Sequence, residues 1–306
     1  MENKKGDITM DLVQLKNRSY LLKNSTNIGL YMFNDKDCLL VDTSYPGKTA
    51  EKLLKFLKEE GLNVKYIINT HGHIDHFGAN ELLAKNFSLE VFASDYEKSF
   101  IKFPDSTHSF LTAAKPISAL ATGLEGMEVN EIKGDYLNLE NHKFKIIELP
   151  GHSRSHIGVL TEDKILYGGD AMLAPSIIEQ IKIPYFYDIE KFRKSILKIK
   201  ELYEKDKMDI YVPSHGKMIK KDFTKAVELN LKKVENLLDL VLSILKDEPL
   251  NLEKIIKKIN IKFNITEGIP NHFITRACIM SFLSYFIEKN KVETVFKDNL
   301  LKYKLK

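Results

Sequence analysis

The chain has 306 residues, of which 43% are hydrophobic and 29% charged, and its formal net charge is +4. These are values of a globular protein with a sizeable core, in one large domain or in a large and a small one. Two cysteines, Cys38 and Cys278, cannot make a disulfide framework, and so mild a charge does not by itself imply nucleic-acid binding.

The sequence also indicates where the protein resides. Its first 22 residues carry charges at both ends and no long apolar run, so we expect no signal peptide. No window approaches 18 apolar residues, so we expect no membrane span. Together with the low cysteine count, this favours a reducing cytoplasm.

The first two thirds of the chain alternate strand-like and helix-like stretches. Helices are predicted from apolar residues at helical spacing, at 47–62, 79–87 and 189–205. Strands are predicted from short apolar runs, at 38–44, 64–70, 89–94, 144–150, 157–163, 164–170 and 209–216. Residues 95–140 are expected to form loops and short helices over one face of the domain.

After residue 220 the pattern becomes helical. We expect a long helix over 220–248, which Pro249 stops, and shorter helices at 252–259 and 272–290. Residues 291–306 fit a hairpin with its turn near Asp298 and Asn299. Helix, helix and hairpin suggest a small winged-helix-like unit, so we predict a first domain over 1–245, with a trailing helix, and a second over 246–306.

Three histidines and an aspartate fall within positions 71–76, although the whole chain has only nine histidines. Three other stretches repeat this layout, in which metal-ligand residue types follow an apolar strand: LPGHSRSH (149–156), YGGDA (167–171) and VPSHG (212–216). A strand end is a rigid platform, and the loop beyond it is where distant side chains can meet. Imidazole and carboxylate ligands without thiolate suit zinc, or else iron or manganese.

These stretches predict a site for two metals. The candidate ligands are His71, His73, Asp75, His76, His152, Asp170 and His215. The first two flank a glycine, which lets both rings face one ion, and the next two can reach a second ion. His152 and His215 would each complete one side, and the two oxygens of Asp170 allow it to bridge both metals.

Three nearby polar residues each leave two interpretations open. Asp42 ends a strand and either orients a metal-bound histidine or caps the turn that follows. His156 either supports a ligand or substrate near His152 or has no such role. Arg154 either contacts an anionic substrate or is simply solvated.

Other residues have plainer interpretations. The isolated histidines, which we take as ordinary hydrogen-bonded residues, are His108, His142 and His272. Tyr185, Phe186 and Tyr187 follow a proline in an expected loop and either line a substrate pocket or belong to the core. Cys278 lies on an apolar helix and is taken as a small buried hydrophobe.

The order His71-x-His73-x-Asp75-His76, followed by His152, Asp170 and His215, resembles the metallo-β-lactamase-fold hydrolase superfamily over about residues 10–220. The resemblance implies an α/β fold, a four-layer αββα sandwich with the metals at one edge. By position it assigns one metal to His71, His73 and His152, the other to Asp75, His76 and His215, and Asp170 to both. The C-terminal unit resembles the small winged-helix domain behind many members of the lactamase-B-like branch.

Two departures narrow the choice within that superfamily. Thiol-containing β-lactamases carry a cysteine where Asp170 stands, and flavodiiron oxidases carry a glutamate where His73 stands, so both are disfavoured. Asp170 aligns the chain with hydroxyacylglutathione hydrolases, lactonases and metal-dependent ribonucleases. The family's glycine-rich stretch reads SRSH here, at 153–156.

This chemistry predicts a metal-dependent hydrolase. A metal lowers the pKa of bound water from about 15.7 to roughly 7, and two metals can hold that water in line with an electrophile. Asp75 would orient the nucleophile and is the catalytic candidate. A GxSxG elbow, a P-loop and a dinucleotide fingerprint are absent from the sequence. We therefore predict two zinc ions and cleavage of an ester-like bond: a thioester, lactone, β-lactam or phosphodiester.

Two alternative functions stay open. One is a mononuclear iron persulfide dioxygenase that uses only the first three histidine ligands. The other is a single-strand RNA endonuclease, because residues 247–306 hold 11 Lys and Arg against 7 Asp and Glu. The lysines that could follow phosphates are Lys289, Lys291, Lys297, Lys302, Lys304 and Lys306. That charge is otherwise a solvated face on a domain that packs beside the active site or forms a homodimer, and we favour a small-molecule or anionic substrate.

Overall fold

The structure, a computed structural model, describes residues 10–118 and 120–306. Residues 1–9, which include much of the start considered for a signal peptide, lie outside the described residues. Within the described ranges, every helix is too short or too polar to cross a bilayer.

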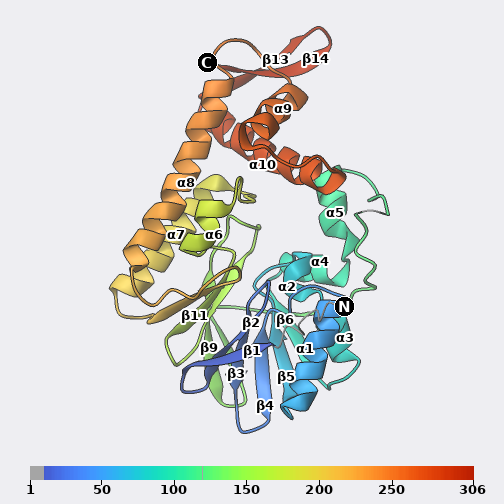
Figure 1. Ribbon diagram of the computed structural model, residues 1–306, viewed down its shortest axis with the longest axis vertical. Helices are drawn as coiled ribbons and strands as arrows, with labels where there is room; N and C mark the ends of the chain where they lie inside the picture. The colour runs from blue at the N-terminus through green and yellow to red at the C-terminus, as the bar shows by residue number, and fades with distance from the viewer. Residues whose placement is uncertain (1–9, 119) are drawn as a thin grey trace, which may run out of the picture.

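Two β-sheets lie face to face in the first domain (Figure 1). The first sheet is antiparallel from β1 to β4 and parallel from β4 to β7: β1 (Asp11–Lys16), β2 (Ser19–Lys23), β3 (Ile28–Met32), β4 (Asp37–Val41), β5 (Asn63–Ile68), β6 (Glu90–Ala93) and β7 (Asn130–Glu131). The second runs in the order β12 (Ile210–Pro213), β11 (Ile165–Gly169), β10 (Ile157–Leu160), β9 (His142–Glu148) and β8 (Tyr136–Leu139), with only the β11–β12 pair parallel.

A hydrophobic core fills the space between the sheets. Leu21 and Ile68 of the first sheet belong to the same buried cluster as Phe144 and Tyr167 of the second. The hydroxyl of Tyr167 donates to the backbone carbonyl of Tyr20 at 2.7 Å, which links the two sheets. Burial of these apolar faces drives the sheets together.

Helices cover the outer face of each sheet, so the layers are helix, sheet, sheet and helix. On the first sheet and around its edge lie α1 (Lys48–Glu59), α2 (Ile74–Phe77), α3 (Asn80–Ala84), α4 (Glu97–Lys102) and α5 (Asp105–Thr112). On the second lie α6 (Pro175–Gln180), α7 (Ile189–Glu204) and α8 (Phe223–Ile244). Leu53 and Leu57 of α1 pack in a core with Leu40 of β4, and Ile196 of α7 packs with Leu166 of β11. The predicted four-layer sandwich is confirmed.

The C-terminal unit follows α8, which runs the length of the molecule's upper half (Figure 1). It contains α9 (Leu252–Phe263), α10 (Ile269–Glu288) and a hairpin of β13 (Val292–Lys297) and β14 (Leu300–Leu305). The two turn residues, Asp298 and Asn299, have φ of 56° and 55°, a conformation that Asp and Asn tolerate well. The helix, helix and hairpin order is as expected, while the boundary at 245 stays a prediction.

The structure also contains elements that the sequence analysis did not predict. Strands β1 to β3 precede the first predicted strand, and the helix expected at 79–87 is shorter, at Asn80–Ala84. A separate turn of helix, α2, begins inside the histidine motif at Ile74. Residues 95–140, expected to form loops and short helices, do form α4 and α5. They also form two short strands, β7 and β8, that were not predicted.

Candidate metal centre

All seven candidate ligands lie together at one edge of the sandwich. They follow the ends of β5, β9, β11 and β12, which are separated by long stretches of chain. Because β4 and β5 are parallel, and β11 and β12 are parallel, their carboxyl ends open toward the same edge. The fold therefore brings together the four stretches in which the sequence analysis placed candidate ligands.

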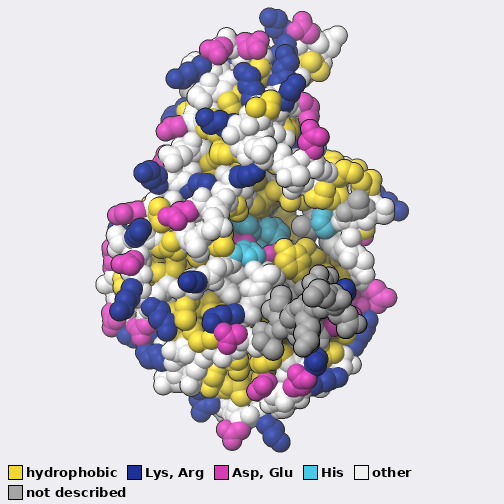
Figure 2. Space-filling view, in the orientation of Figure 1, with side chains coloured by type: hydrophobic (Ala, Val, Ile, Leu, Met, Phe, Trp, Pro, Cys, Tyr) yellow, Lys and Arg dark blue, Asp and Glu magenta, His cyan; other side chains and the backbone are white. Residues whose placement is uncertain are grey.

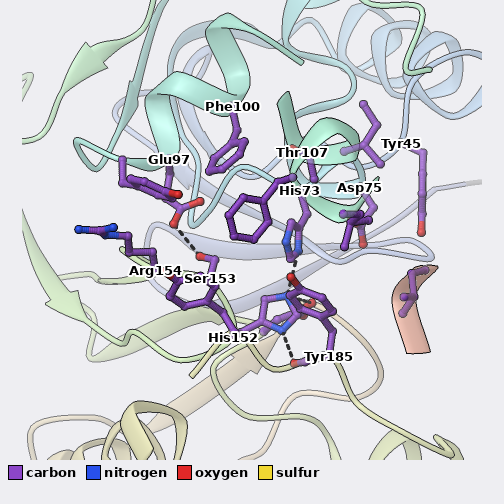
Figure 3. A pocket seen from close by; sticks show the side chains of 17 residues that line it. Tyr45, His73, Asp75, Glu97, Phe100, Thr107, His152, Ser153, Arg154 and Tyr185 are labelled. Atoms are coloured by element: carbon purple, nitrogen blue, oxygen red, sulfur yellow. Dashed lines mark hydrogen bonds and ion pairs between the residues drawn. The ribbon is translucent and has the colours of Figure 1, made fainter. Parts of the chain in front are cut away.

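The first group of ligands consists of three histidines. His73 Nδ1 lies 2.9 Å from His71 Nε2 and 3.0 Å from His152 Nε2. The predicted first set thus has one nitrogen of each ring facing a common point, as Figure 3 shows for His73 and His152.

The second group joins the histidine motif to the loop after β12. Asp75 Oδ2 lies 3.4 Å from His76 Nε2 and 3.3 Å from His215 Nε2. Asp170 stands between the groups, because its Oδ2 lies 3.4 Å from His152 Nε2 and 3.6 Å from His76 Nε2. This is the arrangement expected of a residue that serves two sites.

Burial and charge set the protonation of the cluster. Burial lowers the pKa of His152 to about 3 and that of His71 well below its ordinary value, which leaves their lone pairs free. Burial acts in the same direction on His76, but the carboxylates of Asp75, Asp42 and Asp170 outweigh it and raise the pKa of His76 well above its ordinary value. Without a bound metal, the second group therefore favours a positively charged His76 among negatively charged carboxylates.

The residues present fit a divalent cation. His76 Nε2 and Asp170 Oδ1 are buried and have no hydrogen-bond partner among the described residues. An unpaired buried polar atom costs about 1–3 kcal/mol, so such atoms are expected where a ligand completes them. Nitrogen and oxygen donors without sulfur suit zinc, and also iron or manganese.

Hydrogen bonds from outside the cluster fix the histidine rings. Asp42 Oδ2 lies 2.8 Å from His76 Nδ1 and also accepts from the hydroxyl of Thr70 at 2.8 Å. The other ring nitrogens of His152 and His215 face backbone carbonyls, of Tyr185 at 3.1 Å and Ser25 at 3.0 Å. Of the two interpretations of Asp42, the geometry favours the one in which it orients a histidine.

His156 acts on the cluster through the backbone. Its Nε2 accepts a hydrogen bond from the amide of Asp170 at 3.0 Å, and its side chain is fully buried. A Cβ at Gly169 would lie 2.5 Å from that nitrogen, so the glycine permits the close approach. Of the two interpretations of His156, this hydrogen bond favours the one in which it supports a ligand, here Asp170.

A buried carboxylate that the sequence analysis missed joins two of the ligand loops. Glu97 of α4 accepts hydrogen bonds from the amide of Gly72 at 2.9 Å, from the hydroxyl of Ser153 at 2.7 Å and from the amide of Ser155 at 2.9 Å (Figure 3). It is only 1% exposed. Glu97 thus ties the loop of His73 to that of His152.

A cavity of about 300 Å³ opens beside the cluster. In Figure 2 histidine side chains lie at the bottom of a hollow with hydrophobic side chains around it. Tyr185 and Tyr187 line this cavity, whereas Phe186 between them is buried in the core, so each interpretation of that stretch holds for part of it. Arg154 is exposed at the rim, its guanidinium 4.8 Å from the ring centre of Tyr96.

The remaining predicted positions lie outside the cluster. His142 contacts the Tyr31 hydroxyl at 3.1 Å, and His272 lies 3.8 Å from a carboxylate oxygen of Glu253. His108 lies on α5. Cys278 is buried on α10, as expected.

Comparison with known proteins identifies the family. The profile of the metallo-beta-lactamase superfamily matches residues 23–215, which contain all seven candidate ligands. The chain belongs to the metallo-beta-lactamase superfamily. This membership confirms the predicted class of enzyme, a metal-dependent hydrolase.

Several curated members of the superfamily are similar in sequence. Hydroxyacylglutathione hydrolase GloC of Haemophilus influenzae is 30% identical over 154 residues, which are 49% of this chain and 68% of that protein. Hydroxyacylglutathione hydrolase 1 of Vibrio vulnificus is 33% identical over 143 residues, 47% of this chain and 46% of that protein. The chain thus spans about two thirds of the first relative and under half of the second.

Solved structures of the superfamily match nearly the whole chain. A beta-lactamase domain protein of Burkholderia ambifaria superimposes with a TM-score of 0.75 at 15% identity, covering 99% of this chain and 97% of that one. A metallo-beta-lactamase family protein of Thermus thermophilus gives 0.69 at 19% identity, covering 97% and 99%. At these identities the likeness shows the fold, with the C-terminal unit included.

Proposed function

We propose that this protein hydrolyses the thioester or ester bond of a small molecule, using two divalent metal ions. We propose zinc for both ions, because the donors are nitrogen and oxygen atoms without sulfur. The observation that carries the proposal is the division of seven side chains into two groups with Asp170 between them, at the wall of a cavity of about 300 Å³. The similarity to relatives named hydroxyacylglutathione hydrolases supports a thioester.

The two groups provide the metal sites. His71, His73 and His152 would hold one ion, Asp75, His76 and His215 the other, and Asp170 would contact both. When bound, such a pair acidifies a water molecule and polarises the attacked carbonyl oxygen.

The chain's own residues then align the reaction. The Asp75 side chain is 16% exposed and lines the cavity, so its carboxylate can orient a water toward a carbonyl carbon and carry a proton to the leaving group. His215 Nε2 lies 3.3 Å from that carboxylate, so both residues would face the second ion, and the Ser25 carbonyl 3.0 Å from His215 Nδ1 fixes the ring.

The two alternative functions, a mononuclear dioxygenase and a ribonuclease, account for fewer of the observed contacts. A mononuclear dioxygenase would leave Asp75, His76 and His215 without a role. For the ribonuclease, several tail lysines already form ion pairs, Lys302 with Asp298 and Lys304 with Glu293, each at 2.8 Å. The hairpin that bears them lies at the end of the molecule, beyond α9 and α10 (Figure 1).

A substrate panel with metal analysis tests the proposal. We expect the purified protein to cleave thioesters or esters faster than β-lactams, lactones and phosphodiesters, and to lose this activity to a chelator and regain it with zinc. Elemental analysis should find two zinc per chain and, in His76→Ala, one. Absence of chelator-sensitive turnover, or a single iron that His76→Ala leaves in place, would count against the proposal.

A further inference from the structure

The cavity beside the cluster has a wall that the hydrolytic chemistry does not use. Phe100 of α4, Phe110 of α5 and Tyr187 form a continuous aromatic surface, with ring centroids 6.5 Å and 6.1 Å apart. Ile274 of α10 lines the same cavity, so the C-terminal unit supplies part of its wall.

Part of this wall is exposed. The side chains of Phe110 and Ile274 are 53% and 42% exposed, and both lie at the cavity. Contiguous apolar side chains left in water mark a binding site more often than chance, because burying them releases free energy. An occupant of this wall therefore has an apolar surface.

The candidate metal ligands that line the cavity indicate which part of a substrate would lie on the aromatic wall. His73, Asp75, His152 and Asp170 line the same space, so a group on the aromatic wall is attached to the bond that is cleaved. Small-molecule pockets begin at about 300 Å³. If each non-hydrogen atom takes roughly 30 Å³, as in liquid water, this cavity has room for on the order of ten such atoms.

The charges of the wall argue against glutathione as the occupant. Among the described residues that line the cavity, Arg154 is the single Lys or Arg, and its guanidinium lies over the ring of Tyr96. The buried carboxylate Glu97 is already engaged by three donors. Glutathione carries two carboxylates and an ammonium group, for which the wall offers few partners, whereas a hydrocarbon needs none.

We propose that the substrate is an ester or thioester whose acyl group is a medium-length hydrocarbon chain, seated against Phe100, Phe110, Tyr187 and Ile274. This inference rests on the proposed function, since the carbonyl of that acyl group must face the metal centre. The C-terminal unit then takes part in substrate selection through Ile274.

A chain-length series tests the inference on the zinc-loaded full chain. The substrates are acyl thioesters of N-acetylcysteamine, from acetyl to dodecanoyl, with S-lactoylglutathione as a comparison. We expect kcat/KM to rise about fourfold with each methylene up to roughly octanoyl and then to level off. If kcat/KM does not change with chain length, or if S-lactoylglutathione is preferred over the octanoyl thioester, the inference is overturned. Chelator-sensitive turnover in the same assays would still support the proposed function.

Paired variants assign the effect to this wall. Phe110→Ser and Ile274→Ser should each lower the octanoyl-to-acetyl ratio of kcat/KM by about tenfold, the loss expected when an apolar contact of this size is removed. The matched controls are Phe103→Ser and Ile287→Ser, which change exposed apolar side chains near α5 and on α10 that lie outside the cavity. Equal ratios in all four variants would contradict the assignment.

A binding measurement separates the two proposals. Neutral amides from butanamide to octanamide are titrated calorimetrically into the full chain without added metal. Affinity that rises with chain length and falls in Ile274→Ser, but not in Ile287→Ser, supports the inference even if no thioester is cleaved. Affinity independent of chain length overturns it.

Discussion

The buried carboxylate of Asp42 shows how single residues prepare this site. It is 2% exposed, and it accepts hydrogen bonds from both the amide and the hydroxyl of Thr70 at 2.8 Å while facing His76. A buried charge is costly unless it is paired and hydrogen-bonded, and here the three contacts provide that compensation. In return, the ring of His76 has a single orientation, with Nε2 turned into the cluster.

The Asp42→Asn variant tests this orienting role. An asparagine keeps the size but removes the charge that favours the required ring orientation, so affinity for zinc should fall 10- to 100-fold. Competition with a chromophoric chelator measures this affinity. Asp35→Asn, in an exposed turn, should leave it unchanged. Equal affinities in the two variants would show that Asp42 merely caps its turn.

The sequence reveals some site residues and conceals others for physical reasons. The seven candidate ligands were predictable because histidine and aspartate follow apolar strands, a pattern that few structural roles produce. Glu97 was not, since its partners are two backbone amides and a serine hydroxyl on other loops. Phe110 and Ile274 were hidden for a similar reason, because only the folded chain brings α5 and α10 to one cavity.

At the scale of elements, the tight turn at 150–153 places a ligand. Gly151 has φ of +134°, and a Cβ there would lie 2.2 Å from the backbone nitrogen of Phe192 in α7. Its carbonyl accepts from the amides of Tyr187 and Asp188, both at 2.9 Å. The turn is thus held against the start of α7, and His152 follows it directly.

Substitution of this glycine separates backbone strain from close packing. Gly151→Ala combines an unfavourable φ with a backbone clash, so we expect it to lower the free energy of unfolding by more than about 2 kcal/mol and to weaken zinc binding. Gly123→Ala is the matched control, because Gly123 has φ of +70° but open space around its Cβ position. Denaturant unfolding and zinc titration measure both. A similar loss in the two variants would contradict a role for the packing.

Burial explains part of the predictability of the elements, although the largely buried β3 was not predicted. Strands β4 and β12 are almost wholly buried and gave continuous apolar runs. Strand β1 has an alternating, half-exposed pattern with no fully buried residue, and β7 has two residues, both exposed, so neither carries a clear signal. The buried strands that position ligands were therefore easier to predict than β1 and β7, the exposed edge strands of the first sheet.

At the scale of the whole molecule, one hydrophobic core connects the C-terminal unit with the site. Ile196 of α7, Val234 of α8 and Phe282 of α10 belong to a single buried cluster. The ring of Phe282 lies 5.9 Å from that of Phe186, edge to face. In the sequence, Phe186 stands between Tyr185 and Tyr187, the two tyrosines that line the cavity. Apolar periodicity predicted each helix, but it could not show that their apolar faces share one core.

This shared core leads to a prediction about cooperativity. Phe282→Ala removes a ring that is 1% exposed, at a cost of about 3–5 kcal/mol, and it loosens the support of Tyr185 and Tyr187. If residues 10–306 unfold as one unit, calorimetry should show a single transition at a lower temperature, together with weaker substrate binding. Ile261→Ala, at a side chain 70% exposed on α9, should change neither. Two transitions, of which Phe282→Ala moves only one, would mean that the unit beyond residue 245 folds independently, and the cavity wall at Ile274 would then be a contact between domains.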